Sequence, residues 1–441
     1  MTMGRRPIEQ QPDLWVATTD LPKSPGHVFY DKLNQLLQES GFDSFVEKHC
    51  HQYYADGTGR ESIPPGIYFR MLLIGYFEGL DSQRAIAWRC SDSLSLRAFL
   101  GIPLAEATPD HSSLTRIRQR FPLHVHEEVF LHVLRLAQDK KLLRGKTVAV
   151  DATTLEANAA LRNIVRKDTG EEYKAYLKRL LTEQGVENPT DEDVRRFDKN
   201  RPKKGSNQQW ESPVDPDSRI TKMKDRRTHL AYKAEHVVDL DSEFVLAASV
   251  YTADQSDSST LGESLWEAQA HLALAGSPQE IEETVADKGY HKAQTLADCE
   301  ECSTRTYIPE PKGRHYRSAD SAKRRAVQAN RQRIQRAKSK RLQKRRSELV
   351  ERSFAHVCET GGGRRTWLRG LVNVSKRYVI QVAAHNLALL MRKMFGIGKP
   401  RTLQGRSGGF VGFILWCYWR LTVLKLTREG RATTALLRAA G

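Results

Sequence analysis

The chain has 441 residues, enough for two or three domains, because single hydrophobic cores rarely grow beyond about 300 residues. Its 70 Lys and Arg residues exceed its 53 Asp and Glu residues and give a formal net charge of +17. This excess makes a polyanion the leading class of partner, with a solvated basic surface as the alternative. The six cysteines are too scattered for the disulfide framework of a small secreted domain.

The sequence predicts a soluble protein of a reducing compartment. No apolar segment follows the first residues as it would in a signal peptide. The most apolar stretch, Gly409–Val423, is interrupted by Arg420 and is shorter than the roughly 20 residues of a membrane span. We therefore expect a cytoplasmic protein with no membrane partner.

Residues 1–145 are predicted to form an all-helical N-terminal region. Pro64 and Pro65 precede an apolar helical run, and Asp81 or Ser82 can cap the helix that follows. A further capped helix is expected in TPDHSSLTRIRQRF. Short helices with tight turns and arginines allow a helix-turn-helix-like DNA contact, and a plain helical bundle fits the pattern equally well.

Residues 146–398 are predicted to form a mixed α/β domain. KTVAVDATTLEAN contains a short, β-branched apolar run that ends in an acid, which predicts a buried strand. HLAYKAEHVVDLD with SEFVLAASVYTAD predicts a hairpin that turns at Asp241-Ser242. A helix over about 259–275 leads to a strand in EETVADKGYH. The polar residues 158–225, with one charged helix, are interpreted as an insertion.

Two segments concentrate positive charge. Residues 312–346 contain 15 Lys or Arg residues among 35, with Asp320 as their only acid, and residues 399–441 are predicted to be a basic C-terminal tail. Such a block is often a solvated helix face or a disordered arm. In a chain already this basic, we favour contact with phosphate groups.

Two aspartates stand where strands are expected to end. Asp151 follows Thr147–Val150, and Asp287 follows Thr284–Ala286. One such aspartate is usually structural, but two at the tips of neighbouring strands would lie side by side. A third acid is expected from the helix SELVERSFAHVCE, in which Glu351 shares a face with Phe354; Glu348 and Glu359 are the other candidates there.

At these residues the chain resembles a known family. VAVDATTLEA, VADKGYH and LVERSF, in this order, resemble the three signature regions of DDE transposases of bacterial insertion sequences, most closely the insertion-sequence-five-like branch. GIYFRMLLIGYFEGL and RTWLRGLVNV resemble its N-terminal and C-terminal regions. The resemblance implies an RNase H-like catalytic core with an insertion, preceded by the all-helical domain.

The same resemblance implies a metal-dependent chemistry on DNA. Asp151, Asp287 and Glu351 would hold two Mg²⁺ ions, with Mn²⁺ as a substitute. Two such ions activate the attacking hydroxyl and stabilise the leaving oxygen. Water would nick the element end, and the freed 3′-OH would attack target DNA.

The implied partner is double-stranded DNA, both as terminal inverted repeats and as target, bound at the bacterial nucleoid by a homodimer or larger assembly. Position and charge suggest which residues contact the DNA backbone. The predicted contacts are Arg84, Arg116, Arg118, Lys288, Tyr290, Arg364, Arg365 and Lys376.

The chain departs from the family around Glu351. Related transposases often carry Y-x2-R-x3-E-x6-K, and the outer three positions here hold Lys344, Ser347 and Cys358, with Arg346 and His356 close by. Two alternatives therefore stay open. One is a catalytically inactive, transposase-derived DNA-binding protein, and the other is a metal-dependent nuclease that cuts without joining.

Overall fold

The computed structural model describes residues 27–55, 61–201, 205–223, 227–311 and 320–400. The apolar stretch Gly409–Val423, nearly all of the predicted basic tail and residues 312–319 of the basic segment therefore lie outside the described residues. None of the described helices combines the length and apolar character that a membrane span needs.

Helices precede the first strand, as predicted. Pro64 and Pro65 begin α3, which is buried on almost every side. The hydroxyl of Ser82 caps α4 by accepting a hydrogen bond from the backbone N–H of Ala85 at 3.2 Å. The helices are α1 Val28–Glu39, α2 Phe42–Cys50, α3 Pro65–Phe77, α4 Gln83–Asp92, α5 Leu94–Leu100, α6 His111–Arg120 and α7 Leu123–Asp139.

The long C-terminal helix α14, Leu371–Phe395, packs against α3 and α7, so the helical region and the α/β region share one hydrophobic core. Its central turns are buried almost completely, in keeping with a helix surrounded on all sides. Asn386 on α14 also binds the backbone of Val245, accepting from its N–H at 3.0 Å and donating to its carbonyl at 2.8 Å.

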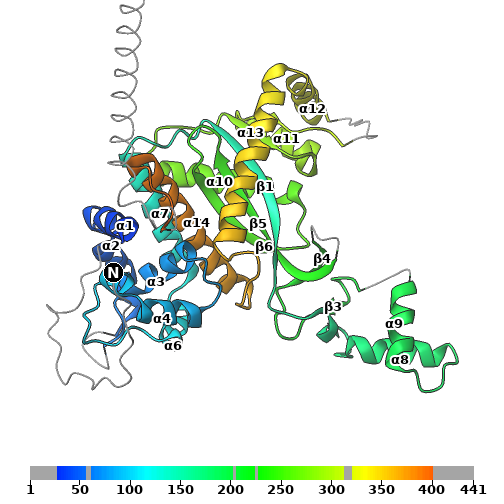
Figure 1. Cartoon of the computed structure of the whole chain (residues 1–441). Helices are drawn as coiled ribbons and strands as arrows, with labels where there is room; N and C mark the ends of the chain where they lie inside the picture. Colours follow the sequence, from blue (N-terminus) through cyan, green and yellow to red (C-terminus); the bar gives the residue numbers. More distant parts are fainter. Residues whose placement is uncertain (1–26, 56–60, 202–204, 224–226, 312–319, 401–441) are drawn as a thin grey trace, which may run out of the picture.

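A mixed sheet forms the centre of the α/β region (Figure 1). Its order is β4-β5-β1-β7-β8, with β6 also paired to β5. Strand β5 runs antiparallel to β1, β4 and β6, whereas β1, β7 and β8 run parallel to one another. The predicted hairpin is confirmed as β5 and β6. The strands are β1 Thr147–Glu156, β4 Arg219–Lys222, β5 Thr228–Asp239, β6 Val245–Thr252, β7 Glu283–Ala286 and β8 Arg305–Tyr307.

Two helices cover opposite faces of this sheet. Successive side chains of a strand point to opposite faces, and on β5 Glu235 contacts α10, Asp257–Leu274, whereas His236 contacts α13, Ala337–Phe354. The ring of His236 stacks on Phe354 with 4.1 Å between centroids and hydrogen bonds to Ser353 and Tyr378. Helices α11 Ala293–Glu301 and α12 Ser321–Ile334 pack together beside β8.

Part of the segment between β1 and β4 projects from this core (Figure 1). Leu177 and Leu181 on α8, Tyr173–Glu183, meet Val194 on α9, Asp191–Asn200, in a small apolar cluster separate from the main core. The second helix lies in the polar stretch, for which the sequence predicted one helix only; Thr190 and Asp193 begin it with a capping box. A short ladder joins β2 Val165–Arg166 to β3 Trp210–Glu211.

Candidate active site

Asp151 lies within β1 rather than at its end, which corrects the sequence prediction. The strand continues to Glu156 because β5 pairs with it throughout, and the backbone of residues 364–366 hydrogen bonds to Glu156. The parallel pairing with β7, however, stops at Val150 and Ala286. Asp151 is therefore the first residue of β1 that has lost its neighbour on that side.

Asp287 directly follows β7, as predicted. It opens a short helical turn, Lys288–Tyr290, and its carboxylate accepts a hydrogen bond from the backbone N–H of Lys288 at 2.6 Å. Because Val150 and Ala286 are paired, Asp151 and Asp287 hold equivalent positions directly after the last paired residues of two adjacent parallel strands. Burial raises the pKa of Asp151, and the negative charge of Asp287 raises it further.

A guanidinium group balances this negative charge. Arg346 on α13 places Nη1 2.6 Å from Oδ2 of Asp151 and donates from Nε to Gln343 at 3.1 Å. Gln343 in turn donates to the carbonyls of Ala286 at 3.2 Å and Tyr307 at 2.7 Å. The charge of Arg346 and the backbone N–H of Ala152 both lower the pKa of Asp151, against the larger effect of burial. Helix α13 is thus fixed across β1, β7 and β8 by polar contacts.

Glu351 also lies on α13 but does not meet the aspartates. It is exposed, and its carboxylate accepts a hydrogen bond from Ser347 at 3.1 Å. Among the described residues, no group of three His, Cys, Asp or Glu side chains is close enough to hold a metal ion. The structure thus brings Asp151 and Asp287 together and leaves Glu351 apart from them.

The pair of aspartates nevertheless fits a divalent cation. Both side chains offer only oxygen donors, which Mg²⁺ prefers. Two neighbouring carboxylates also repel each other unless a positive charge lies between or beside them, and Arg346 now supplies that charge. The two aspartates therefore suit a hard cation.

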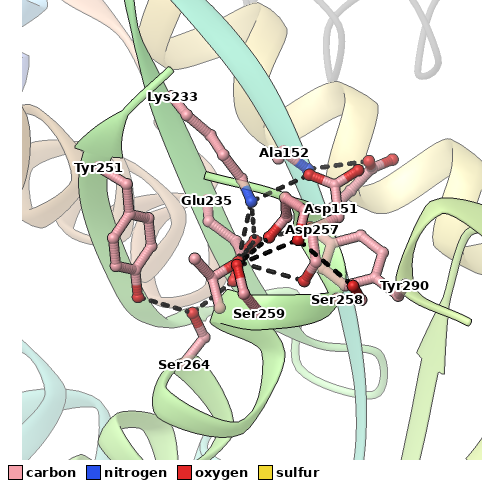
Figure 2. Close-up of polar contacts among 12 residues, drawn as sticks. Asp151, Ala152, Lys233, Glu235, Tyr251, Asp257, Ser258, Ser259, Ser264 and Tyr290 are labelled. Atoms are coloured by element: carbon pink, nitrogen blue, oxygen red, sulfur yellow. Dashed lines mark hydrogen bonds and ion pairs between the residues drawn. The ribbon is translucent and has the colours of Figure 1, made fainter. Parts of the chain in front are cut away.

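Behind Asp287, on the α10 face, lies a buried polar network that the sequence reasoning missed (Figure 2). The carboxylate of Glu235, 1% exposed, accepts hydrogen bonds from Tyr290 at 2.8 Å, Thr260 at 2.8 Å and Ser264 at 2.5 Å. Nζ of Lys233 lies 3.2 Å from Glu235 and 2.9 Å from Asp257. The available signal was the pair of opposite charges, Lys233 and Glu235, in the strand HLAYKAEHVV, because side chains two positions apart lie on the same face of a strand.

This network corrects the role expected for Tyr290. Its side chain is 1% exposed, and its hydroxyl donates to Glu235, so it cannot reach DNA from this position. Gly289, just before it, has no room for a side chain, because a Cβ there would lie 2.7 Å from Oδ2 of Asp257. The network therefore fixes the turn after Asp287 through the contacts of Gly289 with Asp257 and of Tyr290 with Glu235.

Lys376 is a second correction. It is 6% exposed and donates to the backbone carbonyl of Arg118 at 3.0 Å, so it joins α14 to α6 rather than facing solvent. Arg118 is itself half-buried.

The remaining predicted contacts keep some exposure. Arg364 is half-buried and donates to Thr153, to the carbonyl of Thr154 and to Glu359. Arg84, Arg116, Lys288 and Arg365 are exposed.

The described part of the basic segment forms α12 and the first half of α13. Several of its cations contact acids of the core; Lys338, for example, lies 2.5 Å from Glu283. Others are exposed along the two helices: Arg324, Arg336, Lys340, Arg341 and Lys344. Because Arg346 follows on the same helix, this positive surface leads toward Asp151.

Two family models match the chain. Residues 19–120 match "Transposase domain (DUF772)", and residues 276–391 match "Transposase DDE domain". The second match includes Asp287 and Glu351, whereas Asp151 lies outside both matched ranges. No curated protein matches the chain significantly.

Proposed function

From the two matched domains, which identify the chain as a DDE transposase of insertion sequences with an RNase H-like fold, we propose a specific activity. The protein binds the terminal inverted repeats of its own element, cleaves the DNA there and joins the ends to target DNA. Asp151, Asp287 and Glu351 hold the Mg²⁺ ions that this chemistry uses.

The proposal rests above all on the adjacency of Asp151 and Asp287 at the point where β1 and β7 part. A half-buried carboxylate beside a second one is costly without a bound cation or a hydrogen-bonded partner. When bound, divalent ions supply Lewis-acid stabilisation of the charge that develops on phosphate oxygens. The two aspartates hold such ions at a fixed place because their strands belong to the central sheet.

Helix α13 contributes two groups to the proposed mechanism. Arg346 neutralises Asp151 in the free protein, and it would be released from that carboxylate if Asp151 held a divalent ion. Its guanidinium is then available to a DNA phosphate, which it can bind through two N–H groups. Glu351, five residues further along the helix, completes the carboxylate set once the helix or its own side chain adjusts to the bound DNA.

Exposed cations around the site would bind the DNA backbone. Lys288 follows Asp287 directly, and Arg365 pairs with the far end of β1 through its backbone. Arg84 and Arg116 would extend the contact to the N-terminal helices. Cleavage and joining at two element ends require at least two copies of the chain, so we propose that a dimer or larger assembly forms on DNA.

A cleavage assay tests the proposal. The full-length protein is incubated with labelled element-end DNA and Mg²⁺, beside Asp151→Asn, Asp287→Asn and Glu351→Gln variants. We expect nicking at the element end that each substitution reduces at least a thousandfold, and joined products when target DNA is added. Nicking without any joined product would instead identify a nuclease.

One observation favours a second candidate, the inactive DNA-binding protein. The guanidinium of Arg346 forms an ion pair with Asp151, and Glu351 lies apart from the two aspartates. In that case the wild-type protein binds its element ends, yet cuts them with neither Mg²⁺ nor Mn²⁺. Failure to prefer element ends over other DNA would contradict both candidates.

A further inference from the structure

A cavity lies where the N-terminal helices meet the C-terminal part of the chain. The space in it that water can occupy is about 30 Å³, and α3, α4, α6, residues 367–368 and α14 form its walls. Tyr68, Leu72, Ile86, Leu368 and Ile380 give it a largely apolar lining. The cavity is distinct from the carboxylate site, since neither Asp151 nor Asp287 lines it.

Three positively charged side chains also line this cavity: Arg118, Lys376 and Arg377. Among the described residues that line it, none is acidic. Lys376 donates to the carbonyl of Arg118, and Arg377 donates to the carbonyls of Gly362, Asp81 and Arg365. These partners are neutral carbonyl oxygens, which carry no charge to balance the three cations.

Burial makes these charges costly. Desolvation lowers the pKa of Arg118 and of Lys376, and the charge of Arg118 lowers that of Lys376 further. Burial lowers the pKa of Arg377 to about 10, opposed by the more distant charge of Asp81. An anion that joined the three cations would offset this cost.

Two residues that line the cavity also have N–H groups without acceptors. Nε and Nη1 of Arg118 and Nε1 of Trp367 are buried and have no hydrogen-bond partner. The guanidinium carbons of Arg118 and Arg377 lie 5.7 and 5.2 Å from the centre of the Trp367 ring. Three buried donors without acceptors therefore belong to residues that line a space with a net positive charge.

We propose that this cavity binds one phosphate-group oxyanion. A phosphate offers several acceptor oxygens and a negative charge, and a guanidinium binds it through parallel N–H groups. Water could accept the hydrogen bonds but would leave the charges unbalanced. The bound anion would link α6 of the helical region to α14 of the catalytic region. Only the source of the phosphate, DNA backbone or free ion, rests on the proposed function.

The first experiment needs no DNA. The full-length protein is titrated with sodium phosphate by calorimetry, against sodium chloride at equal ionic strength. We expect saturable phosphate binding that Arg118→Gln weakens about tenfold, the loss typical of a hydrogen bond to a charged group. Arg120→Gln, which removes a charge from the same helix outside the cavity, is the matched control and should bind as the wild type does.

A second variant keeps the test decisive if Arg118→Gln unfolds. Trp367→Phe removes one donor but retains an aromatic ring between the guanidinium groups, and it should weaken phosphate binding about fivefold. Wild-type protein that binds phosphate no better than chloride overturns the proposal. Binding that is equal in the wild type and both variants also overturns it, because the anion would then lie elsewhere.

Competition identifies the source of the phosphate. DNA affinity is measured with and without saturating phosphate at matched ionic strength. If a backbone phosphate enters the cavity, phosphate weakens DNA binding by the wild type and not by Arg118→Gln. If the ligand is a free ion, phosphate binds and DNA affinity is unchanged. Loss of element-end binding alone would contradict the proposed function and leave the phosphate titration intact.

Discussion

The guanidinium of Arg346 lies 2.6 Å from the carboxylate of Asp151, where β1 has just lost its pairing with β7. The side chains are 14% and 26% exposed, so water screens the pair only in part. In the proposed mechanism, a metal ion at Asp151 would compete with Arg346 for this carboxylate. Bound DNA would then shift the balance toward the metal by binding the released guanidinium.

Arg346→Gln should increase the affinity of the DNA-free protein for Mn²⁺ about tenfold. The substitution removes a competing cation whose partly buried, charge-assisted bond is worth roughly 1.4 kcal/mol. Calorimetric titration with Mn²⁺ measures the change directly, without relying on catalysis.

Arg345→Gln is the control for this prediction, because Arg345 contacts Asp241 and the carbonyl of Leu240 at the hairpin, away from Asp151. It should leave Mn²⁺ affinity as it is. Weaker metal binding by Arg346→Gln would mean that the arginine positions Asp151 for the metal rather than competing with it.

Tyr290→Phe should lower the free energy of unfolding by about 1–2 kcal/mol and leave DNA affinity unchanged. The hydroxyl donates to buried Glu235, and losing a hydrogen bond to a charged group has a cost of this order. Lys288→Gln, by contrast, removes an exposed charge beside Asp287 and should weaken DNA binding. Denaturant unfolding and a DNA titration of both variants measure the two effects; weaker DNA binding by Tyr290→Phe would restore it as a DNA contact.

The sequence predicted the order of the main elements well because their signals are local. The apolar run before Asp287, the cap at Ser82 and the turn at Asp241-Ser242 all depend on residues within a few positions. The length of β1 beyond Asp151 was not predictable in this way. It depends on the pairing with β5 and on hydrogen bonds to residues 364–366, which lie more than 200 positions away in the chain.

The polar residues were harder to interpret because their surroundings come from distant segments. Tyr290 looked like a DNA contact by its place after Asp287, yet its partner is Glu235 on β5. Lys376 looked basic and exposed, yet α6 covers it. Arg346 was noticed only as a neighbour of a missing motif position, since no sequence pattern indicated that α13 would place it on Asp151.

The Lys233 and Glu235 pair should show strong coupling in a double-mutant cycle. Both side chains are almost fully buried, at 6% and 0% exposed. Lys233→Met leaves a buried carboxylate without its cation and should cost roughly 3 kcal/mol. Glu235→Gln should cost less, because Lys233 keeps Asp257.

The double variant should therefore be more stable than the sum of the two losses predicts, by about 1–3 kcal/mol. Unfolding by denaturant provides the four free energies. Lys174→Met, which removes an exposed ion pair with Asp191, should cost less than 1 kcal/mol. Additive losses at Lys233 and Glu235 would show that the network consists of independent hydrogen bonds.

Acid should destabilise the protein through its buried histidines, and His126 allows a direct test. Its ring is buried between the carbonyl of Pro122 and the hydroxyl of Tyr68, each 3.1 Å away, and burial lowers its pKa to about 3. The unfolded chain binds a proton near pH 6.5, whereas the folded protein does not until pH 3. The stabilisation from neutral His126 is therefore complete above pH 6.5 and is lost as the pH falls toward 3. From pH 7 to pH 5 the loss is about 2 kcal/mol.

His126→Asn should reduce the loss of stability between pH 7 and pH 5 by about this amount, even if the variant is less stable at pH 7, because asparagine does not titrate. Denaturant unfolding of both proteins at the two pH values measures the difference. His132, His356 and His385, whose pKa values burial also lowers, remain in the variant and act equally on both proteins. The same pH dependence in wild type and variant would show that His126 takes up its proton without unfolding, by breaking its bond with Tyr68 alone.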